Sequence, residues 1–369
     1  SSLGESVSVT LSMSSPKLWI SFEFLTFTVG ELDGQENFSA VLDELSAKLL
    51  LKQNMSPKEQ LEQLTHGTAT VLSEKELLTK LDDGRPLRAK LGVDPTAPDI
   101  HLGHTVVLEK LRQFQILGHQ TVLIIGDFTA TVGDPTGRSS TRPPLTREEV
   151  LANAETYTDQ AFKILDRELT EVVYNGDWFR KMSYEEVLKL NARVTMQQML
   201  QREDFKNRLE GAKEIRLHEI QYPIMQGWDS VEVRADVELG GTDQLFNILV
   251  GRDMQKSEGM EAQVAMCLPI LEGTDGVKKM SKSYDNTLAV FEDTNVQKKQ
   301  IMRIATDSRQ MEQPKDPNDD ILFQLYSLFG GSGGLSFLGQ GGHGANVDLL
   351  NAVSGQSSNS VFLEQIATG

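Results

Sequence analysis

The hydrophobic positions of the chain follow strand and helix periods most regularly between about residues 55 and 290. The segments Leu87–Val93, Gln120–Phe128 and Val264–Leu271 have the length and apolar content of strands. The nearly continuous apolar run at Gln120–Phe128 is typical of a strand buried on both faces of a parallel sheet. A fourth segment, Ser230–Leu239, alternates between apolar and polar residues and also predicts a strand.

Helical patterns separate these strands. Pro57–Leu64 predicts a short helix, and His104–Leu117 repeats apolar residues at the spacing of one helical face. A charged helical region is expected at about 147–167, and another helix begins near Thr242 after two glycines. This alternation predicts an α/β fold with a Rossmann-like parallel sheet.

The pattern also divides the chain into regions. Residues 1–54 are Ser-rich and poorly patterned, and we interpret them as an accessory N-terminal extension. The catalytic-type α/β domain is expected at 55–290, with an inserted helical region at about 138–215. A C-terminal helical segment is expected at 291–329. Ten of the forty residues from Gly330 onward are glycine, which predicts a flexible tail at 330–369.

Composition narrows the class of protein. Hydrophobic content of 39% and charged content of 24% fit a globular protein, and no apolar run is long enough to span a bilayer. Cys267 is the single cysteine, which excludes an intrachain disulfide and favours a reducing, cytoplasmic location. Residues 1–54 hold no Arg, three Lys and seven acids, a poor match to a transit peptide. The net charge of −17 argues against a broad basic RNA-binding face.

Two phosphate-handling motifs stand out from this background. The first is His101-Leu102-Gly103-His104, preceded by a stiff loop that contains Asp94 and Thr96. A helix N-terminus stabilises an anion through its free N–H groups, and Gly103 allows a ligand to approach the backbone closely. We therefore expect Thr96, His101 and His104 to donate hydrogen bonds to phosphate oxygens. The alternative is that His104 is only an ordinary helix-start residue, but the preceding DPTAPDI segment and the helix that follows favour the phosphate role.

The second motif is Lys279-Met280-Ser281-Lys282-Ser283, which concentrates positive charge in an acidic chain. A basic loop is usually a solvated surface. The spacing of lysines and hydroxyls instead favours a mobile loop that closes over a pyrophosphate leaving group in the transition state.

A third group of polar residues predicts an amino-acid pocket. Tyr222, Gln226 and Asp229 are spaced to share one helix face, with Pro223 expected in the first helical turn. Burial without a ligand would be costly for such a group, but a solvent-facing polar stripe explains the pattern equally well. Asp94 and Asp134 follow predicted strands, at the edge of a sheet where α/β proteins bind ligands. Gly241 and Asp243 mark another strand-to-helix turn, where an aspartate can accept from ribose hydroxyls.

These motifs occur together and in order. The segments DPTAPDIHLGH, GDPTGRS, YPIMQGWD, ELGGTDQ and KKMSKS resemble bacterial-type tyrosyl-tRNA synthetases, a family of class I aminoacyl-tRNA synthetases, over about residues 55–290. The resemblance implies ATP-dependent activation of L-tyrosine and its transfer to tRNA(Tyr), by a homodimer with the inserted region at its interface. Mg²⁺ would accompany ATP as its counterion, without a dedicated protein metal site.

The resemblance also assigns roles to residues. The catalytic set would be Thr96, His101, His104, Lys279, Lys282 and Ser283. Further ATP contacts would come from Gly103, Gly241, Asp243, Met280 and Ser281. The ammonium and phenol of tyrosine would be bound by Asp94, Asp134, Tyr222, Gln226 and Asp229, with Asp229 accepting from the phenol.

Two departures from the family pattern change these expectations. Lys90 stands where many tyrosyl enzymes have a tyrosine that helps read the phenol, so phenol recognition should depend mainly on Asp229. A Gly/Ser-rich tail stands where the usual C-terminal RNA-binding domain is expected, which questions efficient tRNA charging.

Three other functions remain open from the sequence. A tryptophanyl-tRNA synthetase would share the fold and the lysine loop. A synthetase-like binding protein without aminoacylation activity would also keep the fold. Another adenylate-forming nucleotidyltransferase would use the same ATP motifs without needing the Tyr222–Gln226–Asp229 face.

Overall fold

The computed structural model describes residues 9–14, 17–22, 25–29, 55–135 and 145–305. Contacts divide the chain into two units, Ser1–Ser56 and Pro57–Gly369. In the first unit the strands β1 (Val9–Ser14), β2 (Lys17–Phe22) and β3 (Leu25–Val29) form an antiparallel sheet in chain order. The flexible tail expected at 330–369 and the part of the C-terminal helical segment after Ala305 lie outside the described residues.

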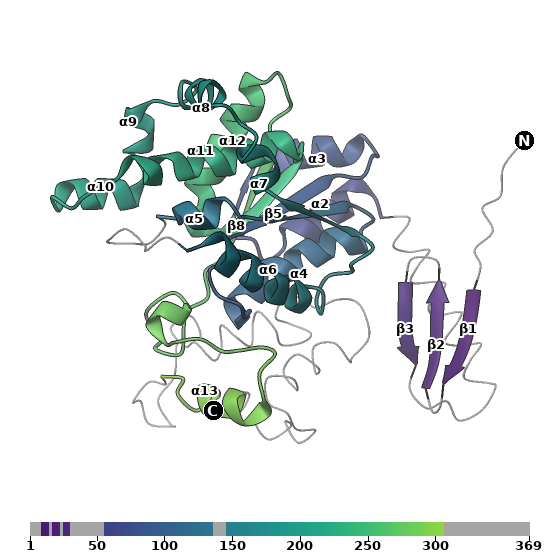
Figure 1. Ribbon diagram of the computed structural model, residues 1–369. Helices are drawn as coiled ribbons and strands as arrows, with labels where there is room; N and C mark the ends of the chain where they lie inside the picture. Colours follow the sequence, from purple (N-terminus) through teal and green to yellow (C-terminus); the bar gives the residue numbers. More distant parts are fainter. Residues whose placement is uncertain (1–8, 15–16, 23–24, 30–54, 136–144, 306–369) are drawn as a thin grey trace, which may run out of the picture. The chain divides into compact units, whose positions relative to one another are not determined.

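The second unit is built on a six-stranded sheet with the order β4-β9-β8-β5-β6-β7 (Figure 1). The five strands from β9 to β7 run parallel, and β4 joins β9 antiparallel. The strand bounds are β4 (Thr70–Leu72), β5 (Arg88–Val93), β6 (Gln120–Ile125), β7 (Thr170–Tyr174), β8 (Val237–Gly241) and β9 (Val264–Leu268). This mostly parallel sheet confirms the predicted α/β class.

Helices cover both faces of the sheet. Their bounds are α2 (Pro57–Thr65), α3 (Glu74–Asp82), α4 (Leu102–Ile116), α5 (Thr129–Val132), α6 (Arg147–Ala161), α7 (Gly176–Phe179), α8 (Tyr184–Asn191), α9 (Met196–Met199), α10 (Glu203–Glu210), α11 (Leu217–Glu232), α12 (Leu245–Ser257) and α13 (Thr294–Ile301). Two short 3₁₀ turns, η1 (Thr242–Gln244) and η2 (Lys282–Tyr284), lie in the loops that follow β8 and β9. In the described part of the chain, no helix is both long and apolar enough to cross a membrane.

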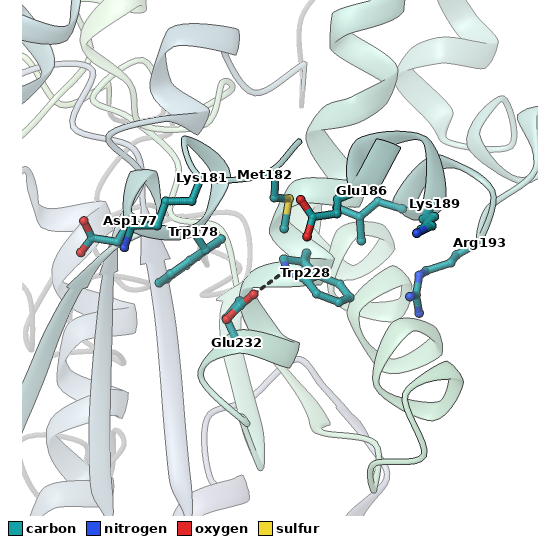
Figure 2. A pocket seen from close by; sticks show the side chains of 10 residues that line it. Asp177, Trp178, Lys181, Met182, Glu186, Lys189, Arg193, Trp228 and Glu232 are labelled. Atoms are coloured by element: carbon teal, nitrogen blue, oxygen red, sulfur yellow. Dashed lines mark hydrogen bonds between the residues drawn. The ribbon is translucent and has the colours of Figure 1, made fainter. Parts of the chain in front are cut away.

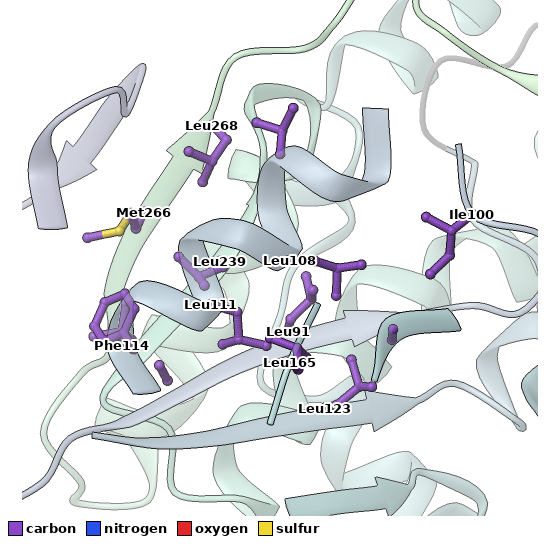
Figure 3. Packing of buried hydrophobic residues seen from close by; sticks show 14 of the residues in the cluster. Leu91, Ile100, Leu108, Leu111, Phe114, Leu123, Leu165, Leu239, Met266 and Leu268 are labelled. Atoms are coloured by element: carbon purple, nitrogen blue, oxygen red, sulfur yellow. The ribbon is translucent and has the colours of Figure 1, made fainter. Parts of the chain in front are cut away.

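Alternation along the strands assigns each residue to a face. Leu91, Leu123 and Met266 pack into the large core under α2, α3, α4 and α6 (Figure 3). The intervening residues Val122 and Ala265 belong to separate clusters on the opposite face, where α11 and α12 lie. Burial on both faces explains why these strands have almost continuous apolar sequences.

One predicted strand is wrong over its first seven residues, 230–236. Ser230–Leu239 does not begin as a strand, because α11 continues to Glu232 and β8 begins only at Val237. Arg234 has a positive φ of 51°, a left-handed conformation that ends the helix. The short alternating run therefore spans a helix end, a turn and a strand.

Two details of the helical predictions also differ. The region 138–215 is not wholly helical, because it contributes the strand β7, which pairs in parallel with β6. Pro223 lies in the second turn of α11 and not in the first, since the helix begins at Leu217. The backbone N–H of Arg216 donates to the Glu219 carboxylate at 2.9 Å and fixes this earlier start.

Candidate functional site

The polar residues predicted from sequence gather at the carboxyl ends of β5, β6 and β8. Asp94 follows the last residue of β5, and its carboxylate accepts hydrogen bonds from Thr129 Oγ1 at 2.7 Å and from the Tyr222 hydroxyl at 2.8 Å. A Cβ on Gly126 would lie 2.0 Å from Asp94 Oδ1, so only glycine fits after β6. Asp94 thereby joins the sheet edge to the helix α11.

The face of α11 formed by Tyr222, Gln226 and Asp229 is turned inward. Tyr222 and Asp229 are buried, and Gln226 is partly buried. The Gln226 side chain donates to Glu238 Oε1 at 3.1 Å and accepts from Asn247 Nδ2 at 2.8 Å. The face is therefore turned toward the protein interior, and the alternative of a solvent-facing stripe is wrong.

Asp229 is the acid of this face, and only 4% of its surface is exposed. Its carboxylate accepts from the Trp178 indole nitrogen at 3.0 Å and from Asn175 Nδ2 at 3.3 Å. Burial raises the pKa of Asp229 from 3.8 to about 7, while the charge of Lys90 and these two donors oppose the rise. A carboxylate held in this way can accept a further hydrogen bond from a substrate donor.

Asp134 is connected to the same wall through a chain of amides. Gln244 Nε2 donates to Asp134 Oδ2 at 2.9 Å, and Asn247 Nδ2 bridges Gln244 and Gln226 at 3.1 and 2.8 Å. Arg202 forms an ion pair with Asp134 at 3.3 Å. Asp134 is thus held by Gln244 of η1 and by Arg202 before α10, and Asn247 of α12 connects Gln244 to Gln226 of α11.

The two histidines meet at the beginning of α4. His101 is the N-cap residue, and its backbone N–H donates to His104 Nδ1 at 3.2 Å. Their rings stack with centroids 3.8 Å apart. Burial is the largest cause that lowers the pKa of His101 to about 2 and that of His104 to about 4, and the charges of Lys279 and Lys282 contribute to both shifts. The neighbouring His104 also contributes to the lowered pKa of His101. Both rings are therefore neutral near pH 7.

One atom of this pair lacks a partner. His101 Nδ1 is buried and makes no hydrogen bond within the protein. A Cβ on Gly103 would lie 3.1 Å from the His101 ring and 3.6 Å from Met280 Cβ, so the backbone there is closely packed. An unpaired buried polar atom at a helix N-terminus suits an anionic ligand.

The lysine loop is attached to acids of the site. Lys279 Nζ forms an ion pair with Asp243, and Lys282 Nζ pairs with Asp99 at 2.8 Å. Asp243 lies in η1, and η1 begins at Thr242, directly after the last residue of β8, Gly241. The contacts bring both lysines to the sheet edge where the histidines lie.

Core packing and hydrogen bonds to Asn286 also hold this loop. Met280 is buried in the main core, and the backbone N–H of Ser281 donates to Asn286 Oδ1 at 2.8 Å. Asn286 Nδ2 donates to the carbonyl oxygen of Lys279 at 3.1 Å. Ser283 of this loop lies in η2. Thr96 lies in a different loop, the one after β5, where its backbone N–H donates to the carbonyl oxygen of Asp94 at 2.7 Å.

Several partners in the site were not predicted from the sequence. Asn175 and Trp178 follow β7. Because β7 was not predicted, their position at the carboxyl end of a strand was not predicted either. Three further residues each bond a predicted site residue: Thr129 donates to Asp94, Asn247 donates to Gln226, and Asp99 accepts from Lys282. Within the described ranges, no group of three or more His, Cys, Asp or Glu side chains could hold a metal ion.

A separate cleft lies beside this site. Its volume is about 560 Å³, and the labelled side chains in Figure 2 come from α7, α8, the residues that follow each of them, and the end of α11. Trp178 and Trp228 line it, and Trp228 Nε1 donates to Glu232 at 2.7 Å. None of the site residues predicted from sequence lines this cleft. Trp178 is shared, because its indole nitrogen also donates to Asp229.

Comparisons with known proteins agree with this geometry. The family model described as tRNA synthetases class I (W and Y) matches residues 82–326. The tyrosine--tRNA ligase of Aquifex aeolicus is 55% identical over 250 residues, which are 68% of this chain and 64% of that protein. The tyrosine--tRNA ligase of Francisella tularensis is 56% identical over 250 residues, which are 68% of this chain and 63% of that protein. The chain thus spans less than two thirds of the length of these relatives.

Solved structures share the fold. The tyrosyl-tRNA synthetase of Archaeoglobus fulgidus complexed with L-tyrosine aligns with a TM-score of 0.60 at 22% identity, covering 73% of this chain and 79% of that chain. A C-terminally truncated mitochondrial tyrosyl-tRNA synthetase from Aspergillus nidulans aligns with a TM-score of 0.55 at 23% identity, covering 87% and 99%. The chain therefore belongs to the class I tRNA synthetase family of the tryptophan and tyrosine type.

Proposed function

We propose that the protein is a tyrosine--tRNA ligase, which activates L-tyrosine with ATP and transfers the tyrosyl group to tRNA(Tyr). The observation that carries this proposal is the buried carboxylate of Asp229, held by Trp178 and Asn175 on the inward face of α11. Its relatives in Aquifex and Francisella are named tyrosine--tRNA ligases.

Asp229 supplies the selectivity in this proposal. Two N–H donors already bond its two oxygens, and each carboxylate oxygen keeps further acceptor capacity. The phenol hydroxyl of tyrosine would donate to it. Phenylalanine has no hydroxyl and would leave the remaining acceptor capacity of this buried carboxylate unfilled, which costs about 1–3 kcal/mol or more for a charged group.

The ammonium of the substrate would lie at the other end of the pocket. Asp134, Tyr222 and Gln226 would contact it, with Asp94 holding the Tyr222 hydroxyl at 2.8 Å. The negative charges of Asp94 and Asp134 favour an ammonium there. Burial and these carboxylates also raise the pKa of Tyr222 well above its usual range, so its phenol stays protonated.

ATP would bind across the histidines and the lysine loop. His101, His104 and Thr96 would donate to its phosphates as neutral groups, and Asp243 beside Gly241 would accept from the ribose. Met280, Ser281 and Gly103 would pack close to the nucleotide. Among the described residues the acids do not form a cage for Mg²⁺, so the ion would arrive with ATP and be held by its phosphates.

Activation needs no nucleophile from the protein. A carboxylate oxygen of tyrosine attacks the α-phosphorus, the bond from that phosphorus to the bridging oxygen breaks, and pyrophosphate leaves. Lys279, Lys282 and Ser283 would stabilise the charge that develops on the leaving group, so catalysis would consist of alignment and electrostatic stabilisation. A ribose hydroxyl at the 3′ end of tRNA then attacks the carbonyl carbon, and AMP leaves.

We also infer a homodimer in the cytoplasm. Large apolar residues are exposed on and around the region at 138–215, among them Tyr184, Leu209 and Leu217. Exposed apolar groups of this kind support a protein interface at α8, α10 and the start of α11. Cys267 is free and buried, which suits a reducing compartment.

Amino-acid-dependent exchange of pyrophosphate into ATP tests the substrate, with tyrosine, tryptophan and phenylalanine assayed in parallel. We expect exchange with tyrosine, with tryptophan and phenylalanine slower by about ten- to hundredfold, since the lost charged hydrogen bond costs about 1.5–3 kcal/mol. Preferred exchange with tryptophan would replace the proposal by a tryptophanyl enzyme. A folded protein that binds ATP but exchanges with none of the three would contradict synthetase activity.

A further inference from the structure

A buried ion pair lies beneath the phenol end of the pocket. Lys90 on β5 and Glu238 on β8 face each other in register, and each has only 1% of its side chain exposed. Lys90 Nζ lies 3.1 Å from Glu238 Oε1. Because Ala89 and Leu91 pack into the core under α4, the alternation of the strand directs Lys90 toward the face covered by α11.

The same pair fixes one turn of α11. Lys90 Nζ donates to Ser230 Oγ at 2.6 Å and to the carbonyl oxygen of Gln226 at 3.2 Å. Glu238 accepts from Gln226 Nε2 at 3.1 Å and from Ser230 Oγ at 3.0 Å. Gln226 and Ser230 are four residues apart and enclose Asp229 between them, so the pair holds both ends of the turn that carries Asp229.

Packing alone does not require this arrangement. A buried ion pair contributes little to stability, and hydrophobic residues of similar size often stabilise a core equally well or better. The charge of a buried ammonium does, however, favour the ionised form of a nearby buried acid, and the charge of Lys90 on β5 acts in this way on Asp229 of α11.

We propose that Lys90 is a positioning residue for tyrosine recognition, which holds the Gln226–Ser230 turn and keeps Asp229 charged to accept the substrate phenol. This inference rests on the proposed function.

The groups around Asp229 support this role. Lys90 from β5 lowers its pKa and is the largest opposing influence to burial, ahead of the donors Asn175 and Trp178. Glu238 from β8 raises it more weakly, and Tyr222 is the other titratable group on α11 that interacts with Asp229. Without Lys90, burial and the charge of Glu238 would raise the pKa of Asp229 further.

The pH dependence of tyrosine activation in Lys90→Met tests the proposal. In the parent, KM for tyrosine should fall as pH rises and level off above a midpoint near 7, where Asp229 becomes ionised. In Lys90→Met the midpoint should move upward by about one pH unit, raising KM for tyrosine about fivefold at pH 7. The value of kcat at saturating tyrosine should change by less than about twofold.

Two further variants keep the test interpretable. Lys90→Met/Glu238→Gln leaves no unpaired buried charge, so it preserves folding if the single variant does not, and its midpoint should lie between those of the parent and Lys90→Met. Lys80→Met removes another buried lysine, whose partner Asp236 precedes the opposite end of β8, and should lower the melting temperature without moving the midpoint.

The two hypotheses fail in different ways. A parent protein that does not exchange pyrophosphate with tyrosine contradicts the proposed function. A parent that does exchange, with folded Lys90 variants that keep its midpoint and its KM, contradicts the role of Lys90.

Discussion

At the scale of single residues, the site is built from buried groups that are expensive to keep. Asp229, His101 and Lys90 are all buried, and each is unlike the apolar residues that would pack best there. His101 Nδ1 lacks a partner, and Asp229 has a raised pKa. Such costs are expected where stability is given up for ligand binding.

The cost of Asp229 predicts a measurable pH dependence of stability. Its folded pKa of about 7 lies above the unfolded value of 3.8, so the folded protein binds the proton more tightly and loses stability as pH rises between these values. Asp229→Asn removes this effect. Relative to the parent, its free energy of unfolding should increase by about 2 to 3 kcal/mol from pH 5 to pH 8.

Chemical denaturation of both proteins at several pH values measures this difference. A difference that stays constant from pH 5 to pH 8 would show that Asp229 titrates normally in the folded protein.

At the scale of elements, two pieces of the chain position the chemistry. α11 packs closely against α12 at Gly227, where an added Cβ would lie 3.1 Å from both Gly251 N and Val250 Cγ1. The lysine loop after β9 is held by Asn286, which bonds Ser281 N and the carbonyl oxygen of Lys279. The first element carries Tyr222, Gln226 and Asp229, and the second carries the side chains of Lys279 and Lys282 to the sheet edge.

The loop predicts different effects for two neighbouring lysines. Lys282→Ala should lower the rate of tyrosine activation by about a hundredfold, the cost of one group that stabilises transition-state charge, with little change in tyrosine affinity. Lys278→Ala is the matched control, since Lys278 Nζ lies over the Tyr284 ring at 5.1 Å and has no role in the proposed mechanism. Single-turnover formation of the adenylate measures both rates. Equal rates for Lys282→Ala and the control would remove Lys282 from the mechanism.

At the scale of the whole molecule, the sequence predicts the fold class and most of the site, and the reasons are physical. Strands buried on both faces are apolar throughout, so Gln120–Ile125 and Val264–Leu268 are recognisable without any partner. The edge strand Thr170–Tyr174 is only partly buried and short, and its pattern is lost among helices. Asn175 and Trp178 could not be predicted, because their position depends on that strand.

Pairings between distant segments are the other part that sequence does not reveal. A lysine in a strand gives no sign that it will be buried against Glu238, 148 positions later (238 − 90), or that it will hold α11. The sequence also does not reveal whether Tyr222, Gln226 and Asp229 face the protein interior or the solvent. The packing of α11 onto β5 and β8 turns them inward.

The most direct test of the central claim is a comparison of tyrosine activation and ATP binding in Asp229→Ala. The account predicts that kcat/KM for tyrosine in pyrophosphate exchange falls by about ten- to hundredfold, since a buried charged acceptor is lost, while the Kd for ATP changes less than about twofold. Equal losses of both quantities, or unchanged activation of tyrosine, would contradict the assignment of Asp229 as the group that reads the phenol.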